Sequence, residues 1–376
     1  MQKGYPKLTR AFTTSTWKSR FEEDKVGIRL TQSHLQSVDK PLGGTLREFG
    51  HLQCLPLSNN TALLCGEHCQ DNPGYCMLVT TDSDDGHVTG EMTTTGPGLN
   101  YTIPQTCVVS GGYLYRNEFH QKRTERVPVD SIFSHLEHPP QETRRYLNSL
   151  PFERVCDYPL GKDIPRVWFD QMFELNGSLY RFGYPCDTGN KTSRFARLWR
   201  LDIRNICEGG GLDKWQYTGL RVSSLVGEPL LVAKQGEVAY IFRQKGTRMN
   251  MYRLSFPGGV RTLSKGPRTP VQFRWVFPLG ARHLVGYHCA ATEEAFHSDR
   301  VTPSSSVTVY LHDTVSGEWY RHFRVSHEYP CFLHSVSPLS LSPSVPYVRH
   351  VLQFRVTEAT CHVTVIEYDT DLLVFR

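Results

Sequence analysis

The sequence predicts an all-β protein, a β-propeller of about six four-stranded blades with a short helical insertion. The first observation is the segment 173–183, in which two apolar strands flank Asn176-Gly177. Because Asn-Gly accepts positive φ at both turn positions, this segment predicts a tight antiparallel hairpin. Alternating residues at 196–202 and the segment from Trp215 predict a third and a fourth strand. Four consecutive strands joined by turns form one blade.

The second observation is that similar segments recur along the chain. Gly66, Gly183 and Gly286 each begin a Gly-x-x-Cys tetrapeptide after an apolar stretch. They lie 117 and 103 residues apart, which leaves room for two repeats of about 50 to 60 residues in each interval. Strand–turn–strand patterns at 106–115 and 230–242 fit the intervening repeats. The count is therefore six blades, with five or seven as alternatives.

The segment 173–215 also follows a known order of residues. An apolar strand, Asn-Gly, Leu-Tyr and a strand-end glycine precede an apolar strand that ends in aspartate, and tryptophan follows. This order resembles a kelch repeat, although Phe182-Gly183 stands where that repeat has two glycines. Asp313 and Trp319 have the spacing of the kelch segment Asp-x-x-Thr-x-x-Trp. The resemblance implies structural roles for Asn176, Gly177, Tyr180, Gly183, Asp202, Trp215, Gly66, Gly286, Asp313 and Trp319.

The resemblance divides the chain into a polar N-terminal arm, 1–50, and a kelch-like propeller, 51–376. A propeller must close its ring, because a bare outer strand edge invites aggregation. The last blade has three clear strands, and 372–375 is short for a fourth. Val26–Leu30 is a strand-like segment that no other blade needs. We therefore expect residues between about 20 and 40 to pair with the C-terminal blade.

The least regular part of the propeller is 128–165, where apolar residues have helical spacing. We expect a helical insertion between the second and third blades. Insertions on one face of a repeat fold often bind partners.

Composition and cysteine usage bound the class of protein. The net charge is +5 over 376 residues, and no long basic run occurs, so no nucleic acid is expected as a partner. No stretch is long and apolar enough for membrane insertion. The 11 cysteines are scattered beside apolar strands, which is typical of reduced, buried thiols. These observations favour a cytoplasmic protein, with a nuclear location as an alternative and secretion less expected.

Three short motifs suggest chemistry, and each has a plainer interpretation. Cys65, His68, Cys69 and Cys76 cluster without a standard zinc spacing, so strand-end thiols are expected. The segment 83–86 resembles the Asp-box of sialidases but lacks a residue between aspartate and glycine, so a polar turn is expected. The segment 151–160 resembles the box by which some ubiquitin-ligase receptors bind elongin C, but Pro151 and Pro159 oppose the helix it needs.

No catalytic, cofactor-binding or metal-ligating residue is assigned from the sequence, and no cofactor is expected. No nucleophile elbow, phosphate loop or dinucleotide fingerprint occurs. The expected function is therefore non-catalytic protein binding, as an adaptor, a scaffold or a subunit of a complex whose protein partner is not readable. The alternatives are a propeller enzyme, of hydrolase or oxidase type, with its site at the central channel, and a ubiquitin-ligase substrate receptor. Convergence of charged side chains with histidine or tyrosine would favour the enzyme.

Overall fold

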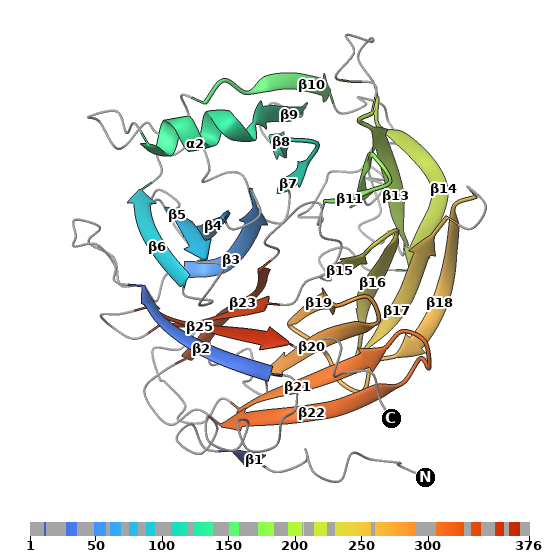
Figure 1. Cartoon of the computed structure of the whole chain (residues 1–376). Helices are drawn as coiled ribbons and strands as arrows, with labels where there is room; N and C mark the ends of the chain where they lie inside the picture. Colours follow the sequence, from blue (N-terminus) through green and yellow to red (C-terminus); the bar gives the residue numbers. More distant parts are fainter. Residues whose placement is uncertain are drawn as a thin grey trace.

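The computed structural model describes residues 11–12, 28–35, 49–57, 61–68, 75–81, 88–94, 107–118, 123–137, 150–157, 172–183, 195–204, 206, 214–223, 230–256, 260–289, 306–326, 332–339, 350–356 and 361–368. Its strands form six sheets that follow one another around a ring (Figure 1). This arrangement confirms the predicted all-β propeller, and six sheets agree with the predicted number of blades.

Each sheet is one blade, and the four main strands of each blade are antiparallel to their neighbours. The first blade contains β3 (Phe49–Pro56), β4 (Thr61–His68), β5 (Tyr75–Thr81) and β6 (Val88–Thr94). The second contains β7 (Cys107–Ser110), β8 (Tyr113–Glu118), β9 (Arg123–Pro128) and β10 (Glu153–Asp157). The third contains β11 (Phe173–Leu175), β12 (Ser178–Gly183), β13 (Phe195–Asp202) and β14 (Gln216–Ser223).

The C-terminal half forms the other three blades. The fourth contains β15 (Leu230–Gln235), β16 (Val238–Lys245), β17 (Arg248–Ser255) and β18 (Thr262–Arg268). The fifth contains β19 (Trp275–Leu279), β20 (His283–Cys289), β21 (Ser306–Asp313) and β22 (Trp319–Ser326), with β1 (Ala11–Phe12) parallel to β22. The sixth contains β23 (Phe332–Leu339), β24 (His350–Val356), β25 (Cys361–Tyr368) and β2 (Ile28–Leu35).

The first strand of each blade lies innermost. Each of β3, β7, β11, β15, β19 and β23 contacts the inner strands of the two neighbouring blades, so these six strands surround the axis of the ring (Figure 1). The strands therefore close a complete ring around this axis.

An N-terminal strand completes the last blade. β2 pairs with β25 over eight positions, from Ile28 opposite Tyr368 to Leu35 opposite Cys361. The segment thus supplies the outer strand that the C-terminal blade lacks. The short segment 372–375 lies outside the described residues. Joining the two ends of the chain in one sheet removes the open edge of β25.

The predicted helical insertion is only partly correct. Helix α2 (Val129–Glu137) follows β9 directly, but β10 then returns to pair with β9. The helix therefore lies inside the second blade and not between the second and third blades. Val155 and Cys156 of β10 are buried against the third blade, so packing gives this segment a strand conformation despite the flanking prolines.

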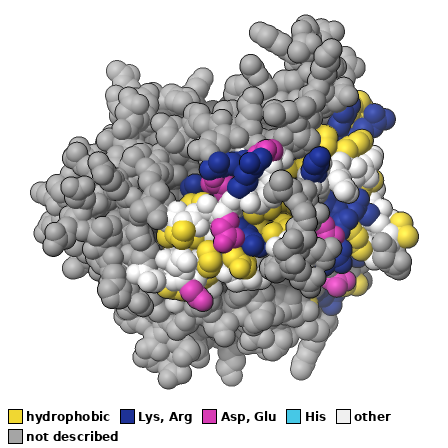
Figure 2. Space-filling model, turned by 90° about the horizontal axis from the view of Figure 1, so that it is seen from above, with side chains coloured by type: hydrophobic (Ala, Val, Ile, Leu, Met, Phe, Trp, Pro, Cys, Tyr) yellow, Lys and Arg dark blue, Asp and Glu magenta, His cyan; other side chains and the backbone are white. Residues whose placement is uncertain are grey.

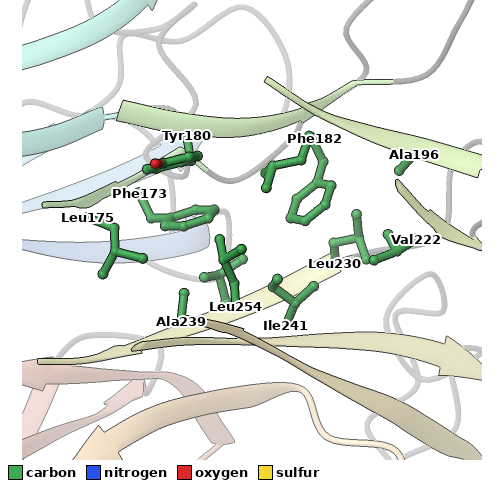
Figure 3. Packing of buried hydrophobic residues seen from close by; sticks show 12 residues of the cluster. Phe173, Leu175, Tyr180, Phe182, Ala196, Val222, Leu230, Ala239, Ile241 and Leu254 are labelled. Carbon is green, nitrogen blue, oxygen red and sulfur yellow. The ribbon is translucent and has the colours of Figure 1, made fainter. Parts of the chain in front are cut away.

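Hydrophobic clusters fill the spaces between neighbouring blades. The cluster between the third and fourth blades joins Phe173 and Tyr180, whose rings stack with centroids 5.6 Å apart, to Ile241 and Leu254 of the fourth blade (Figure 3). Because β12 is covered on both faces, all six of its residues are buried, including Arg181. The Asn176-Gly177 turn has φ of 51° and 66°, the geometry that the hairpin requires.

None of the helices in the described ranges is long and apolar enough to cross a membrane.

Candidate functional site

A chain of hydrogen bonds joins the second and third blades. Trp215 Nε1 donates to Thr124 Oγ1 at 2.9 Å, and Thr124 Oγ1 donates to Asn117 Oδ1 at 2.9 Å. The guanidinium of Arg181 lies over the Trp215 ring, with its Cζ 4.6 Å from a ring centroid. Arg181 and Trp215 are 2% and 3% exposed. A desolvated cation over an indole is attracted by roughly 2 kcal/mol, which holds Trp215 in place within the third blade. The hydrogen bond from Trp215 to Thr124 then joins this blade to the second.

Charged side chains of the second blade lie in ion pairs. Glu125 is a buried carboxylate that pairs with Arg116 at 2.7 Å and with Arg123. Burying such a group without a partner is costly, which accounts for the two arginines. Figure 2 looks onto the side of the ring that carries β10 and α2, and shows basic side chains beside acidic ones. The outward-facing pairs are Arg126–Glu153 and Arg154–Asp157.

A second polar cluster lies at the turns of the fifth blade. Arg282 donates to both carboxylate oxygens of Asp313, at 2.8 and 2.6 Å, and Val315 N donates to Asp313 Oδ1 at 3.0 Å. The Arg282 guanidinium holds the pKa of the Asp313 carboxyl well below its usual range. Gln235 of the fourth blade donates to the carbonyl oxygen of His283 at 3.0 Å. The cluster therefore fixes the turns and ties two blades together.

Two histidines beside this cluster are buried. His312 Nδ1 donates to the carbonyl oxygen of Glu318 at 3.0 Å, and its ring stacks on Trp319 with centroids 4.6 Å apart. Burial lowers the pKa of His312 to about 4 and also lowers the pKa of His283. Both imidazoles are therefore neutral at pH 7, and their positions are those of packed core residues.

The inner strands carry an ion pair of a different kind. Glu174 of β11 and Lys234 of β15 pair across the third and fourth blades. Their side chains are 16% and 41% exposed, so solvent reaches both. Glu174 Oε1 also accepts a hydrogen bond from Gly177 N at 2.9 Å, so the predicted turn orients the carboxylate. A partly exposed carboxylate and ammonium are groups that can exchange protons with a bound substrate.

The structure places the repeat positions in turns and at blade contacts. Tyr180 is buried beside Phe173, and Asp202 pairs with Arg200 and Arg204. A Cβ on Gly286 would lie 2.8 Å from the ring of Phe273, which accounts for glycine there. Asn176 and Gly177 form the hairpin turn, and Gly183 ends β12. Trp215 and Trp319 pack between blades, and Asp313 binds Arg282. Gly66 lies in β4, opposite Leu52 and Tyr75.

The three candidate motifs find no site among the described residues. No group of three or more possible metal ligands occurs in the ranges given above, and Cys69 lies outside them. The Asp-box-like segment also lies outside them. The elongin-like segment contains strand β10 and not the helix that such a box needs, so the described part of the segment gives the ubiquitin-ligase interpretation no support.

Sequence reasoning missed a local concentration of charge. Residues 230–268, the span of the fourth blade, contain eight Lys and Arg and one acidic residue, Glu237. The blade therefore carries +7, although the whole chain carries +5. A count of charge per blade would have found it, whereas a search for consecutive basic residues could not.

Comparisons with known proteins give relatives only at the level of structure. No family model and no curated protein matches the chain. An α-L-arabinanase from Penicillium chrysogenum is 12% identical and covers 91% of this chain and 99% of its own, with a TM-score of 0.46. An α-L-arabinofuranosidase from Fusarium graminearum is 10% identical with the same coverage and a TM-score of 0.44. A Trypanosoma rangeli sialidase mutant is 10% identical, covers 93% and 60%, and has a TM-score of 0.47.

These comparisons correct the expected function. The similar structures named above are hydrolases and not scaffold or adaptor proteins, so the interpretation as a non-catalytic adaptor is not supported. The kelch family is not shown, because no family model matches, and the expected protein partner has no support in the described part of the chain. At these identities and TM-scores the likeness transfers no substrate and no residue role.

Proposed function

We propose that the chain is a propeller enzyme of the hydrolase type, with its reaction at the central channel. The observation that carries the proposal is the Glu174–Lys234 pair on neighbouring inner strands. Both side chains belong to the innermost layer of the ring and both are reached by solvent. The network around Trp215 and the cluster around Asp313 are less suitable as reaction sites, because their charged and aromatic groups hold blades and turns together.

In the proposed reaction, Glu174 acts as the general acid or base. The Gly177 N–H fixes one carboxylate oxygen, and Lys234 contacts the other. Because the ammonium of Lys234 is positively charged, it can stabilise an oxyanion that develops in the substrate. Such chemistry transfers a group to water without a cofactor.

The experiment is a hydrolysis screen of the purified full-length chain against chromogenic esters, glycosides and peptides. One class should be hydrolysed, and Glu174→Gln should lower kcat/KM about 100-fold or more. Glu153→Gln is the matched control, because Glu153 is an ion-paired carboxylate on an outer strand, and it should change kcat/KM by less than about twofold. Equal activity of the wild type and Glu174→Gln, or no turnover of any class, would contradict the proposal.

We also propose that the third and fifth blades are kelch-type repeats. The Asn176-Gly177 turn, the close approach of Gly286 in β20 to Phe273, and the placement of Asp313 and Trp319 support this. A cytoplasmic location is proposed as well, supported by the 11 cysteines that are scattered beside apolar strands in the sequence. Glycans on the intact protein would contradict that location.

A further inference from the structure

The charge of the fourth blade gathers at one end of its sheet. Lys245 and Arg248 face each other across the β16–β17 hairpin, and Arg268 lies opposite Asn250, two residues along β17. All three basic side chains are exposed. Among the described residues, none of the three has an ion-pair partner. This end of the sheet, where β15 also begins, is called the basic end below.

Protection of a sheet edge does not account for the basic end. Lysine, proline and bulges on an outer strand discourage pairing with other chains, and Lys265 and Pro267 on β18 fit that role. Lys245 and Arg248 are instead on β16 and β17, which have a strand on each side. Leaving three unpaired cations close together raises the electrostatic energy of the fold, and an anionic ligand would remove that repulsion.

Asn250 adds a second, independent observation. It is 5% exposed, and its Oδ1 has no donor among the described residues. The strand ladder places Asn250 between Arg243 on β16 and Arg268 on β18. A buried acceptor without a donor costs about 1–3 kcal/mol. A ligand that brings a hydroxyl group, directly or after a small adjustment of Asn250, would supply the missing donor.

The surroundings disfavour nucleic acid. Binding of single strands uses exposed aromatic faces on which bases stack. The exposed aromatic side chains of the neighbouring third blade, Phe195 and Tyr217, already have the guanidinium groups of Arg221 and Arg197 over their rings. A ligand with anionic groups and hydroxyl groups, and without bases, fits the described residues better.

We infer that the basic end binds an acidic oligosaccharide chain, through its carboxylate or sulfate groups. Arg248 and Arg268 would hold these groups in forked hydrogen bonds, and Lys245 would add a point charge. Asn250 would accept a hydrogen bond from a sugar hydroxyl. Lys234, the partner of Glu174, lies toward the opposite end of β15 from Leu230, at which the strand begins. The inference therefore goes beyond the proposed hydrolase and does not depend on turnover.

The test is titration calorimetry of the full-length chain with four probes of equal length and with one neutral control. The probes are a sulfated oligosaccharide, an oligogalacturonate, oligo-dT and oligoglutamate, and the control is a neutral glucan. We expect at least one acidic oligosaccharide to bind more tightly than oligo-dT and oligoglutamate, and more weakly as NaCl rises from about 50 to about 300 mM. The sulfated and carboxylated probes distinguish the two sources of charge. Absent binding, equal binding of the neutral glucan, or tighter binding of oligo-dT or oligoglutamate would overturn the inference.

Paired triple variants locate the site. The site variant is Lys245→Gln, Arg248→Gln and Arg268→Gln, and the control is Lys214→Gln, Arg253→Gln and Lys265→Gln, which removes the same charge from other exposed positions. The site variant should weaken binding about tenfold or more, while the control should change it by less than about threefold. Equal weakening would mean that only net charge matters and would overturn the inference. If the site variant does not fold, Arg248→Gln alone replaces it, and unchanged affinity then counts against the site.

Discussion

Trp215 Nε1 donates a hydrogen bond to Thr124 Oγ1 at 2.9 Å, across 91 residues of sequence and between two blades. The indole also lies under the Arg181 guanidinium. Replacing Trp215 with alanine removes both contacts and leaves a cavity, so the free energy of unfolding should fall by about 3–5 kcal/mol. Urea denaturation measures this change. Trp215→Phe, which keeps most of the packing, should cost less. An unchanged denaturation midpoint for Trp215→Ala would show that this contact does not hold the blades together.

Gly286 tests the close approach between β20 and Phe273. A Cβ at this position would lie 2.8 Å from the ring, which is 2% exposed and has little room to move. Gly286→Ala should therefore destabilise the fold by about 1–3 kcal/mol. Phe273→Leu removes the ring. Gly286→Ala should therefore lower the free energy of unfolding by less in the Phe273→Leu protein than in the wild type. Additive effects of the two substitutions would contradict the proposed steric conflict.

The buried histidines predict a loss of stability in weak acid. The pKa of His312 is lowered to about 4, and that of His283 is lowered as well, because burial disfavours the imidazolium. Below the unfolded pKa of about 6.5 the unfolded chain binds protons that the folded chain does not. Stability should therefore be full above pH 7 and fall between pH 6.5 and about 4, by up to about 3 kcal/mol from His312.

Urea midpoints measured from pH 7.5 to pH 4.5 would detect this loss. His312→Gln should flatten the dependence, whereas Arg282→Gln should not, because the depressed pKa of Asp313 contributes stability that is lost only below its ordinary value near 3.8. A wild-type midpoint that stays constant down to pH 4.5 would contradict the burial of neutral histidines.

Local signals in the sequence predicted the fold, whereas contacts between residues far apart in the sequence were harder to predict. The Asn176-Gly177 pair specifies its own turn geometry, so the central hairpin could be inferred from two residues. β10 could not, because Pro151 and Pro159 suggest irregular structure, and its strand conformation depends on pairing with β9 and packing against the third blade. Pattern rules also assign Arg181 to a solvated face, although the neighbouring blade buries it.

The Glu174–Lys234 pair and the basic end could not be predicted from the sequence, because both depend on contacts between distant segments. Glu174 and Lys234 are 60 residues apart, and only the ring brings their strands together. The basic residues of the fourth blade are separated from one another by other residues, so they form no run in the sequence and concentrate only when the sheet forms. Charge summed over a predicted blade would have indicated them.

A reaction at the centre of the ring requires that the ring is closed, so the proposed site depends most on the pairing of β2 with β25. Deleting residues 1–35 removes β2 and exposes the edge of β25. Deleting residues 1–26 is the matched control, because it removes β1 but keeps β2. The first deletion should lower the melting temperature of the whole domain, and the second should have a smaller effect.

Hydrogen exchange of the backbone amides in β25 (Cys361–Tyr368) is the most direct measurement of this closure. These amides should be protected in the full-length chain and in the chain lacking residues 1–26, because β2 covers the strand edge. They should exchange at least about tenfold faster in the chain lacking residues 1–35, since the outer hydrogen bonds are lost. Equal protection of β25 in all three proteins, with equal melting temperatures, would contradict the closure of the ring by the N-terminal strand.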